Sequence, residues 1–174
     1  MRILATAVLA TSLVAWVPAA QAADTTTFNV RIAITKACTI TAAAATDVDF
    51  GTVSSTATGN TDAAGSVTAQ CTALTPYTIA LNAGVNAGTA NDVTTRRMRN
   101  TDTTVTSNNL VPYQLYQDSA RTQVWGSTAG NNVVSGSGNG ANQTFQVFGR
   151  VANPSLANAA AGSYQDTVTA TITY

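Results

Sequence analysis

The sequence lacks the side chains that most enzymes use to move protons. It contains no histidine and no glutamate, and Lys36 is its only lysine. Without histidine, the ordinary Ser-His-Asp and Cys-His nucleophile pairs cannot form. Asp47 and Asp49 share one face of a predicted strand, but two carboxylates are too few for a calcium site. We therefore expect no enzyme, no cofactor and no bound metal ion.

Charge of either sign is also scarce. The chain has 8 basic and 8 acidic residues, and all of the acidic ones are aspartates. A chain with this balance has no electrostatic footprint for nucleic acid or for an anionic membrane, so we expect neither partner. Arg96, Arg97 and Arg99 form the one basic cluster. A solvated strand or loop is the preferred interpretation of this cluster, with an anion or nucleic-acid site as the alternative.

The composition is poor for amphipathic helices, because leucine, lysine, arginine and glutamate are scarce or absent. Threonine, alanine, asparagine, glycine and valine dominate instead, as in strands that are joined by polar turns. Alternating segments indicate about seven to nine short strands. Their spacing predicts an all-β fold, an antiparallel sandwich with an immunoglobulin-like arrangement.

The N-terminus has the pattern of a secretion signal, assigned to residues 1–22. Arg2 precedes a mainly apolar run over residues 3–17, and Ala20-Gln21-Ala22 is a small-x-small cleavage site. A membrane anchor is the weaker alternative, because the run is shorter than the ~20 residues that a spanning helix needs. The mature chain from Ala23 is the size of a single domain.

The sequence contains only two cysteines, Cys38 and Cys71. Export places them in an oxidising compartment, which predicts one disulfide between them. A free or intermolecular thiol is the alternative.

Residues 26–35 alternate as a strand with one apolar face. This face consists of Phe28, Val30, Ile32 and Ile34. Alternation alone is equally compatible with burial of this face in the chain's own domain and with its burial in another copy of the protein.

The last strand, predicted over residues 164–174, is the most regular. One parity holds Tyr164, Asp166, Val168, Ala170, Ile172 and Tyr174, and the other is rich in threonine. The glycine-rich stretch 126–142 is predicted to be a long hairpin loop. Trp125, just before it, is interpreted as a core residue, with stacking on a sugar as the alternative.

A series of different short motifs extends along nearly the whole mature chain. They are the alternating strand that ends at Cys38, Phe50-Gly51, residues 67–71, residues 77–81 followed by Gly84, Arg97-Met98, residues 113–116 with Asp118, Trp125-Gly126, residues 147–149 and residues 162–174. In this order and spacing the sequence resembles the spore coat protein U domain family, which includes the subunits of archaic, Csu-type chaperone–usher pili.

The resemblance implies an immunoglobulin-like sandwich, over residues 37–174, that lacks its last strand. A periplasmic chaperone would first fill the resulting groove. At an outer-membrane usher, residues 23–36 of the next identical or homologous subunit would replace it, with Phe28, Val30, Ile32 and Ile34 inserted. Val168, Ala170, Ile172 and Tyr174 would line the groove and contact the chaperone.

This resemblance implies export through the periplasm to a surface pilus that supports adhesion and biofilm formation. Such head-to-tail pairing does not close on itself and therefore makes a fibre. Two alternatives remain at this point. One is a secreted, self-contained β-sandwich binding module, which would fold its first strand back into its own core. The other is a coat protein of spores or of the cell surface.

Overall fold

The computed structural model describes residues 21–42, 46–153 and 155–174. The predicted secretion signal lies outside the described residues, apart from its last two positions. Among the residues that are described, no helix is long and apolar enough to cross a membrane. The chain forms two units, residues 1–33 and residues 34–174.

The described part of the first unit carries no helix and no strand. The side chains of Phe28, Val30 and Ile32 are 85%, 87% and 88% exposed. The apolar face that the sequence predicts is therefore present but uncovered.

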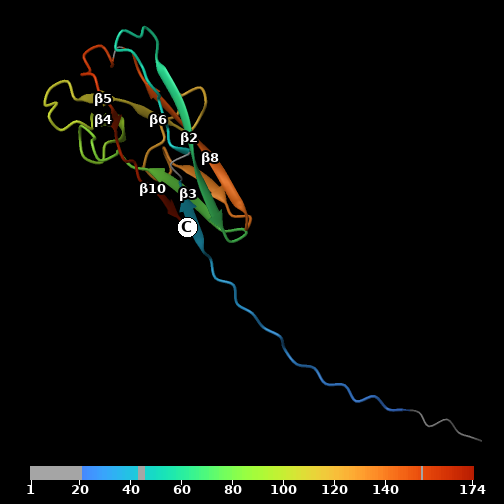
Figure 1. The fold of residues 1–174 in the computed structure, drawn as a ribbon. Helices are drawn as coiled ribbons and strands as arrows, with labels where there is room; N and C mark the ends of the chain where they lie inside the picture. The colour runs from blue at the N-terminus through green and yellow to red at the C-terminus, as the bar shows by residue number, and fades with distance from the viewer. Residues whose placement is uncertain (1–20, 43–45, 154) are drawn as a thin grey trace, which may run out of the picture. The chain divides into compact units, whose positions relative to one another are not determined.

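The second unit is built from short antiparallel strands (Figure 1). They are β1 (Cys38–Thr41), β2 (Thr61–Cys71), β3 (Pro76–Leu81), β4 (Arg97–Asn100), β5 (Leu110–Pro112), β6 (Gln114–Tyr116), β7 (Val134–Ser137), β8 (Asn142–Val151), β9 (Tyr164–Gln165) and β10 (Ala170–Thr173). A 3₁₀ turn, η2 (Val93–Thr95), precedes β4. The predicted all-β antiparallel class is confirmed.

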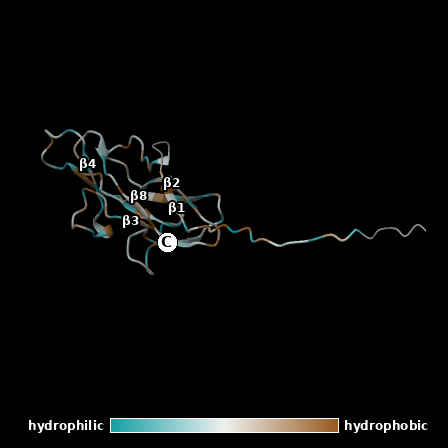
Figure 2. Ribbon diagram, turned by 90° about the horizontal axis from the view of Figure 1, so that it is seen from below, coloured by the Kyte–Doolittle hydropathy of each residue, from teal (hydrophilic) through white to brown (hydrophobic). Residues whose placement is uncertain are grey.

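The strands form three sheets with the orders β1-β2-β8-β6, β10-β3-β7 and β5-β4-β9. The pairing of β2 with β8 is the longest, running from Thr61 opposite Val151 to Gln70 opposite Asn142. One buried core joins residues of all three sheets, such as Ala69 of β2, Ile79 of β3 and Val111 of β5. Figure 2 shows hydrophobic and hydrophilic residues interspersed along the ribbon, as expected where strands bury one face.

Trp125 is a core residue, as the sequence indicates. Its side chain is fully buried, and the indole Nε1–H donates a hydrogen bond of 2.9 Å to the carbonyl of Ile79. The polar atom of the ring is therefore satisfied inside the core, as a buried tryptophan requires.

The disulfide joins Cys38 of β1 to Cys71 of β2, with an S–S distance of 2.02 Å. The two residues are direct partners in the antiparallel register of these strands. Cys71 is buried in the core, whereas Cys38 is half-buried at the edge strand. The bond therefore fastens β1, the first strand of this unit, to the long strand β2.

Arg96 contradicts the preferred interpretation of the arginine cluster, since its side chain is only 1% exposed. Its guanidinium donates to the carbonyls of Leu81 and Asn82 at the end of β3 and to Oε1 of Gln114. Burial lowers the pKa of Arg96 to about 10. This burial could not be predicted from the sequence, because the hydrogen-bond acceptors of Arg96 belong to segments that are distant in the chain.

The glycine-rich stretch 126–142 is more ordered than predicted, because it contains β7. β7 pairs with β3, and Gly136 stands opposite Tyr77. A Cβ atom at Gly136 would lie 2.5 Å from Cζ of Tyr77, so a glycine is needed for this pairing. The glycine that suggested a loop is therefore required by a tertiary contact.

The first prediction concerns the disulfide, which closes a loop over a separation of 33 residues. Replacing Cys38 and Cys71 with alanine is expected to lower the free energy of unfolding by about 3–4 kcal/mol, because the unfolded chain regains loop entropy. Urea unfolding of the mature protein measures this loss. The parent protein unfolded in reductant is the matched control, and no difference between its oxidised and reduced forms would contradict the prediction.

A second prediction concerns Arg96. Arg96→Met removes charge-assisted hydrogen bonds to buried acceptors and is expected to cost about 3 kcal/mol in the free energy of unfolding. Arg99 of β4 is exposed, so Arg99→Met should change the free energy of unfolding by less than about 0.5 kcal/mol. Equal losses in the two variants would show that Arg96 does not hold the end of β3.

Candidate functional site

The core of the second unit is open along one side. A cavity of about 450 Å³ lies there between two chain segments, one at residues 46–50 and the other at residues 164–170. Its floor is made of core side chains from four strands and from the residue between β5 and β6. They are Val67, Leu81, Leu115, Val147 and Tyr113.

A second cavity of about 590 Å³ shares Val48, Phe50, Met98 and Tyr164 with the first. It is lined further along by residues 51–53 on one side and by residues 159–163 on the other. The two cavities thus form one elongated depression, which we call the open groove. Its walls are residues 46–53 and residues 159–170.

Two glycines allow the first wall to lie close against the large sheet. A Cβ atom at Gly149 would lie 2.4 Å from Cγ1 of Val48, and one at Gly65 would lie 2.3 Å from the carbonyl oxygen of Thr46. Gly65 belongs to β2 and Gly149 to β8. Residues 46–50 therefore pass over this sheet without being a named strand of it.

The second wall is the C-terminal segment, which is predicted as one strand but is divided into β9 and β10. β9 pairs with β4, and β10 pairs with β3 of a different sheet. The segment thus crosses from one sheet to another. Residues 166–169 between the two pairings belong to no strand.

The side chain of Asp166 holds this crossing in place. Its Oδ1 accepts hydrogen bonds from the backbone N–H groups of Val85 and Asn86, both at 3.0 Å. Its Oδ2 accepts a hydrogen bond of 2.6 Å from the hydroxyl of Tyr113 on the groove floor. The carbonyls of Thr167 and Thr169 also accept backbone hydrogen bonds from Val85 and Asn82, so the segment stays attached to the chain that follows β3 although residues 166–169 form no strand.

Burial and the hydrogen bond to Asp166 raise the pKa of Tyr113 well above its usual range. The phenol therefore stays protonated and remains a donor at any physiological pH. Asp47 is the other acid on the lining of the first cavity, which has no basic residue among those that the structure describes. Such a lining can take up apolar side chains.

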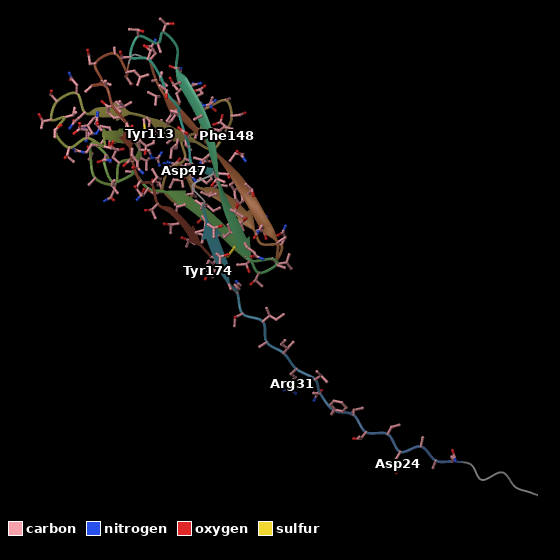
Figure 3. The ribbon with its side chains drawn as sticks, viewed as in Figure 1. Asp24, Arg31, Asp47, Tyr113, Phe148 and Tyr174 are labelled. Carbon is pink, nitrogen blue, oxygen red and sulfur yellow. A yellow bond between two sulfur atoms is a disulfide. The ribbon has the colours of Figure 1, made fainter. Side chains whose placement is uncertain are left out.

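The predicted wall residues fall in two groups. Val168 and Ala170 line the open groove. Ile172 packs against the core beside them, opposite Ile79 in the pairing of β10 with β3, and is not on the cavity lining. Tyr174 follows β10 and is 58% exposed (Figure 3).

The four residues predicted to be donated are all exposed, and Ile34, the last of them, is 79% exposed. The first wall and residues 159–163 were missed as groove residues by the sequence reasoning. Gly149 was the available signal for the first wall, because a glycine at an inward position of an apolar strand indicates the close approach of another backbone.

Among the described residues, no group of three or more histidine, cysteine or acidic side chains could hold a metal ion. The disulfide occupies both cysteines.

The sequence and the fold were compared with those of known proteins. The sequence model of the Spore Coat Protein U domain matches residues 24–171. Protein U of Myxococcus xanthus is 36% identical over 173 residues, which cover 95% of this chain and 93% of that protein.

A similar fold occurs in the crystal structure of the CsuC–CsuE chaperone–tip adhesion subunit pre-assembly complex, from archaic chaperone–usher Csu pili of Acinetobacter baumannii. The TM-score is 0.55 at 24% identity, and the match covers 81% of this chain and 40% of that chain. This chain therefore spans less than half of the chain it matches, and the likeness concerns the fold alone. The family match and the relative together show that the chain belongs to the Spore Coat Protein U domain family.

Proposed function

We propose that this protein is a structural subunit of a chaperone–usher pilus and not an enzyme. The observation that carries the proposal is the open groove along the core, in a chain that also has an exposed, alternating apolar segment. Membership of the Spore Coat Protein U domain family and the fold shared with a chaperone-bound subunit of Csu pili support it.

In this proposal, residues 23–36 of one subunit enter the open groove of the next. The inserted residues are Phe28, Val30, Ile32 and Ile34. Their burial would contribute roughly 6–12 kcal/mol before the cost of ordering the segment, at about 1.5–3 kcal/mol for each side chain. Because donor and acceptor surfaces differ, each added subunit offers a new groove and the assembly grows as a fibre.

The partners before assembly are a periplasmic chaperone and an outer-membrane usher. An open apolar groove is an aggregation hazard, so a subunit in transit needs a protein that fills it. The proposed chaperone contact is the second wall and the strand that continues it, through Val168, Ala170, Ile172 and Tyr174. Residues 1–22 direct export and are removed, and residues 37–174 form the folded domain of a surface pilus that supports adhesion and biofilm formation.

A third prediction concerns two separate abilities of the subunit, donating residues 23–36 and accepting them in the open groove. Ile32→Asp with Ile34→Asp should leave a subunit that accepts a donor segment but cannot donate one, because carboxylates would enter an apolar groove. Val168→Asp on the second wall should have the reverse defect. Each variant alone is expected to form no contact between subunits, and a mixture of the two should stop at a dimer of subunits. Size-exclusion chromatography of the mature proteins, expressed together with the chaperone, measures this.

The same proteins run unheated and heated on a denaturing gel supply the control. The parent chain is expected to give a ladder that disappears on heating, and removal of residues 23–35 should abolish it. A stable monomer with or without these residues would instead support a self-contained secreted module. Normal-length polymers from the Ile32→Asp, Ile34→Asp variant would contradict donation by this segment.

A further inference from the structure

A separate cavity of about 450 Å³ lies beside β4, β5 and β6 and is lined by three arginines, Arg96, Arg97 and Arg150. None of its lining residues among those that the structure describes carries a carboxylate. The complete sequence has only seven arginines, and three of them meet at this one cavity. We call it the arginine cavity. The open groove and the proposed assembly do not use it.

The first source of positive potential is Arg96. Its hydrogen-bond acceptors are two backbone carbonyls and a side-chain amide, all of them neutral. Asp166 contributes a negative charge nearby, but the hydrogen bond to that carboxylate is donated by the hydroxyl of Tyr113 and not by Arg96. A buried guanidinium without a directly paired acid leaves a net positive field in its surroundings.

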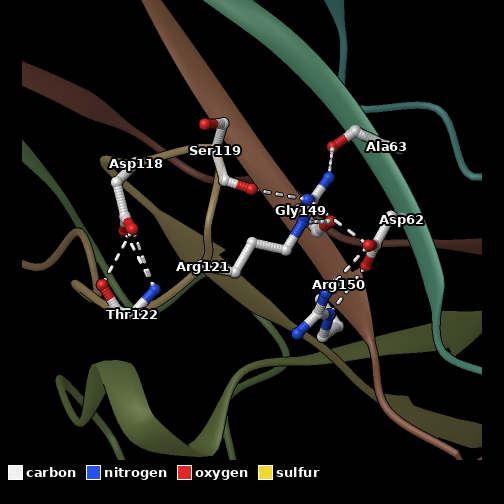
Figure 4. A network of polar contacts seen from close by, with 8 residues as sticks. All are labelled: Asp62, Ala63, Asp118, Ser119, Arg121, Thr122, Gly149 and Arg150. Carbon is white, nitrogen blue, oxygen red and sulfur yellow. Dashed lines mark hydrogen bonds and ion pairs between the residues drawn. The ribbon is translucent and has the colours of Figure 1, made fainter.

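The second source is a cluster of two arginines around one acid, Asp62 (Figure 4). Arg150 binds both carboxylate oxygens of Asp62, at 2.7 and 2.8 Å, and Nη1 of Arg121 lies 3.3 Å from the same carboxylate. One negative charge thus faces two positive charges, so the cluster keeps a net charge of +1. Arg121 does not line the cavity, so the net charge of the cluster acts on the cavity only as a field from nearby.

Two donors remain for a ligand. Nε and Nη2 of Arg97 donate to the carbonyls of Asn86 and Ala87, which fixes the guanidinium, while its Nη1 donates to no described residue. Nη1 of Arg150 likewise has no hydrogen-bond partner among the described residues. Among the residues that the structure describes, no buried side-chain nitrogen or oxygen lacks a partner, so both Nη1 groups are accessible to solvent. Arginines held in this way are pre-organised for an anion.

The rest of the lining indicates what kind of anion. Pro112 and Tyr116 offer apolar surface, and the hydroxyl of Ser155 forms no hydrogen bond with any described residue. A volume of about 450 Å³ is within the range of sites for small organic molecules and larger than an inorganic anion needs. We propose that the arginine cavity binds a sugar acid, with the carboxylate on Arg97 and Arg150 and the ring against Tyr116.

The test is calorimetric titration of the mature chain with galacturonate, with galactose and sulfate as the neutral-sugar and anion-only probes. Galacturonate is expected to bind saturably, at least about tenfold more tightly than either control, because a charge-assisted hydrogen bond is needed together with ring contacts. Tetragalacturonate separates the two sources of the ligand. Tighter binding of the oligomer identifies an acidic polysaccharide, and equal or weaker binding identifies a free sugar acid.

Arg97→Gln should weaken binding of galacturonate by about tenfold or more, because it removes the fixed donor and its charge. Arg99→Gln is the matched control, since Arg99 lies on the same strand but does not line the cavity. It should change the affinity by less than about twofold. Hydrogen–deuterium exchange of the parent chain locates the ligand without any substitution, and galacturonate should protect peptides covering residues 94–97, 112–116 and 150–155.

Four results would overturn the proposal. Three of them are the absence of saturable galacturonate binding, sulfate binding of equal strength, and equal weakening by the two arginine variants. Protection located outside those peptides would also overturn it.

Discussion

The uncovered side of the core is the constraint on which the rest of this unit depends. A β-sandwich must cover its core along every side, and here the floor residues Leu115 and Val147 are reached through the open groove. Specific contacts position both walls of the groove. The first wall lies close against the sheet that contains β2 and β8, at Gly65 and Gly149. The second is held by hydrogen bonds to Asp166. A groove with fixed walls can receive an added strand without first having to form.

Buried polar groups hold the end of β3 and the second wall in place. Arg96 binds the carbonyl groups at the end of β3, and Tyr113 connects the groove floor to the second wall through Asp166. Each buried polar side chain among the described residues has its partner. Arg96 also lines the arginine cavity, together with Arg97 and Arg150, and no described lining residue of that cavity is an acid. The hydrogen bonds that hold the end of β3 therefore lie next to the candidate ligand site.

Much of the fold was predictable because it depends on local alternation. β2, β3 and β8 each show the period of two in the sequence, and their inward residues are those found in the core. The disulfide followed from two cysteines and a predicted export signal. The predictions failed where a distant residue decides the outcome. β7 was interpreted as a loop because its glycine is explained only by the ring of Tyr77, and Arg96 was interpreted as exposed because its acceptors are 14 to 18 positions away.

The sequence by itself determined the all-β class, the faces of the main strands, the disulfide and the family, since these depend on composition, period and the order of short motifs. It also determined that Phe28, Val30, Ile32 and Ile34 share one apolar face. The resemblance implied an open core, but only the tertiary structure decided where the opening lies, which segments form its walls, and that the last strand divides at Asp166. These features depend on contacts between residues far apart in the chain, such as Asp166 with Tyr113 and Val48 with Gly149. A periodic pattern contains no information about such contacts.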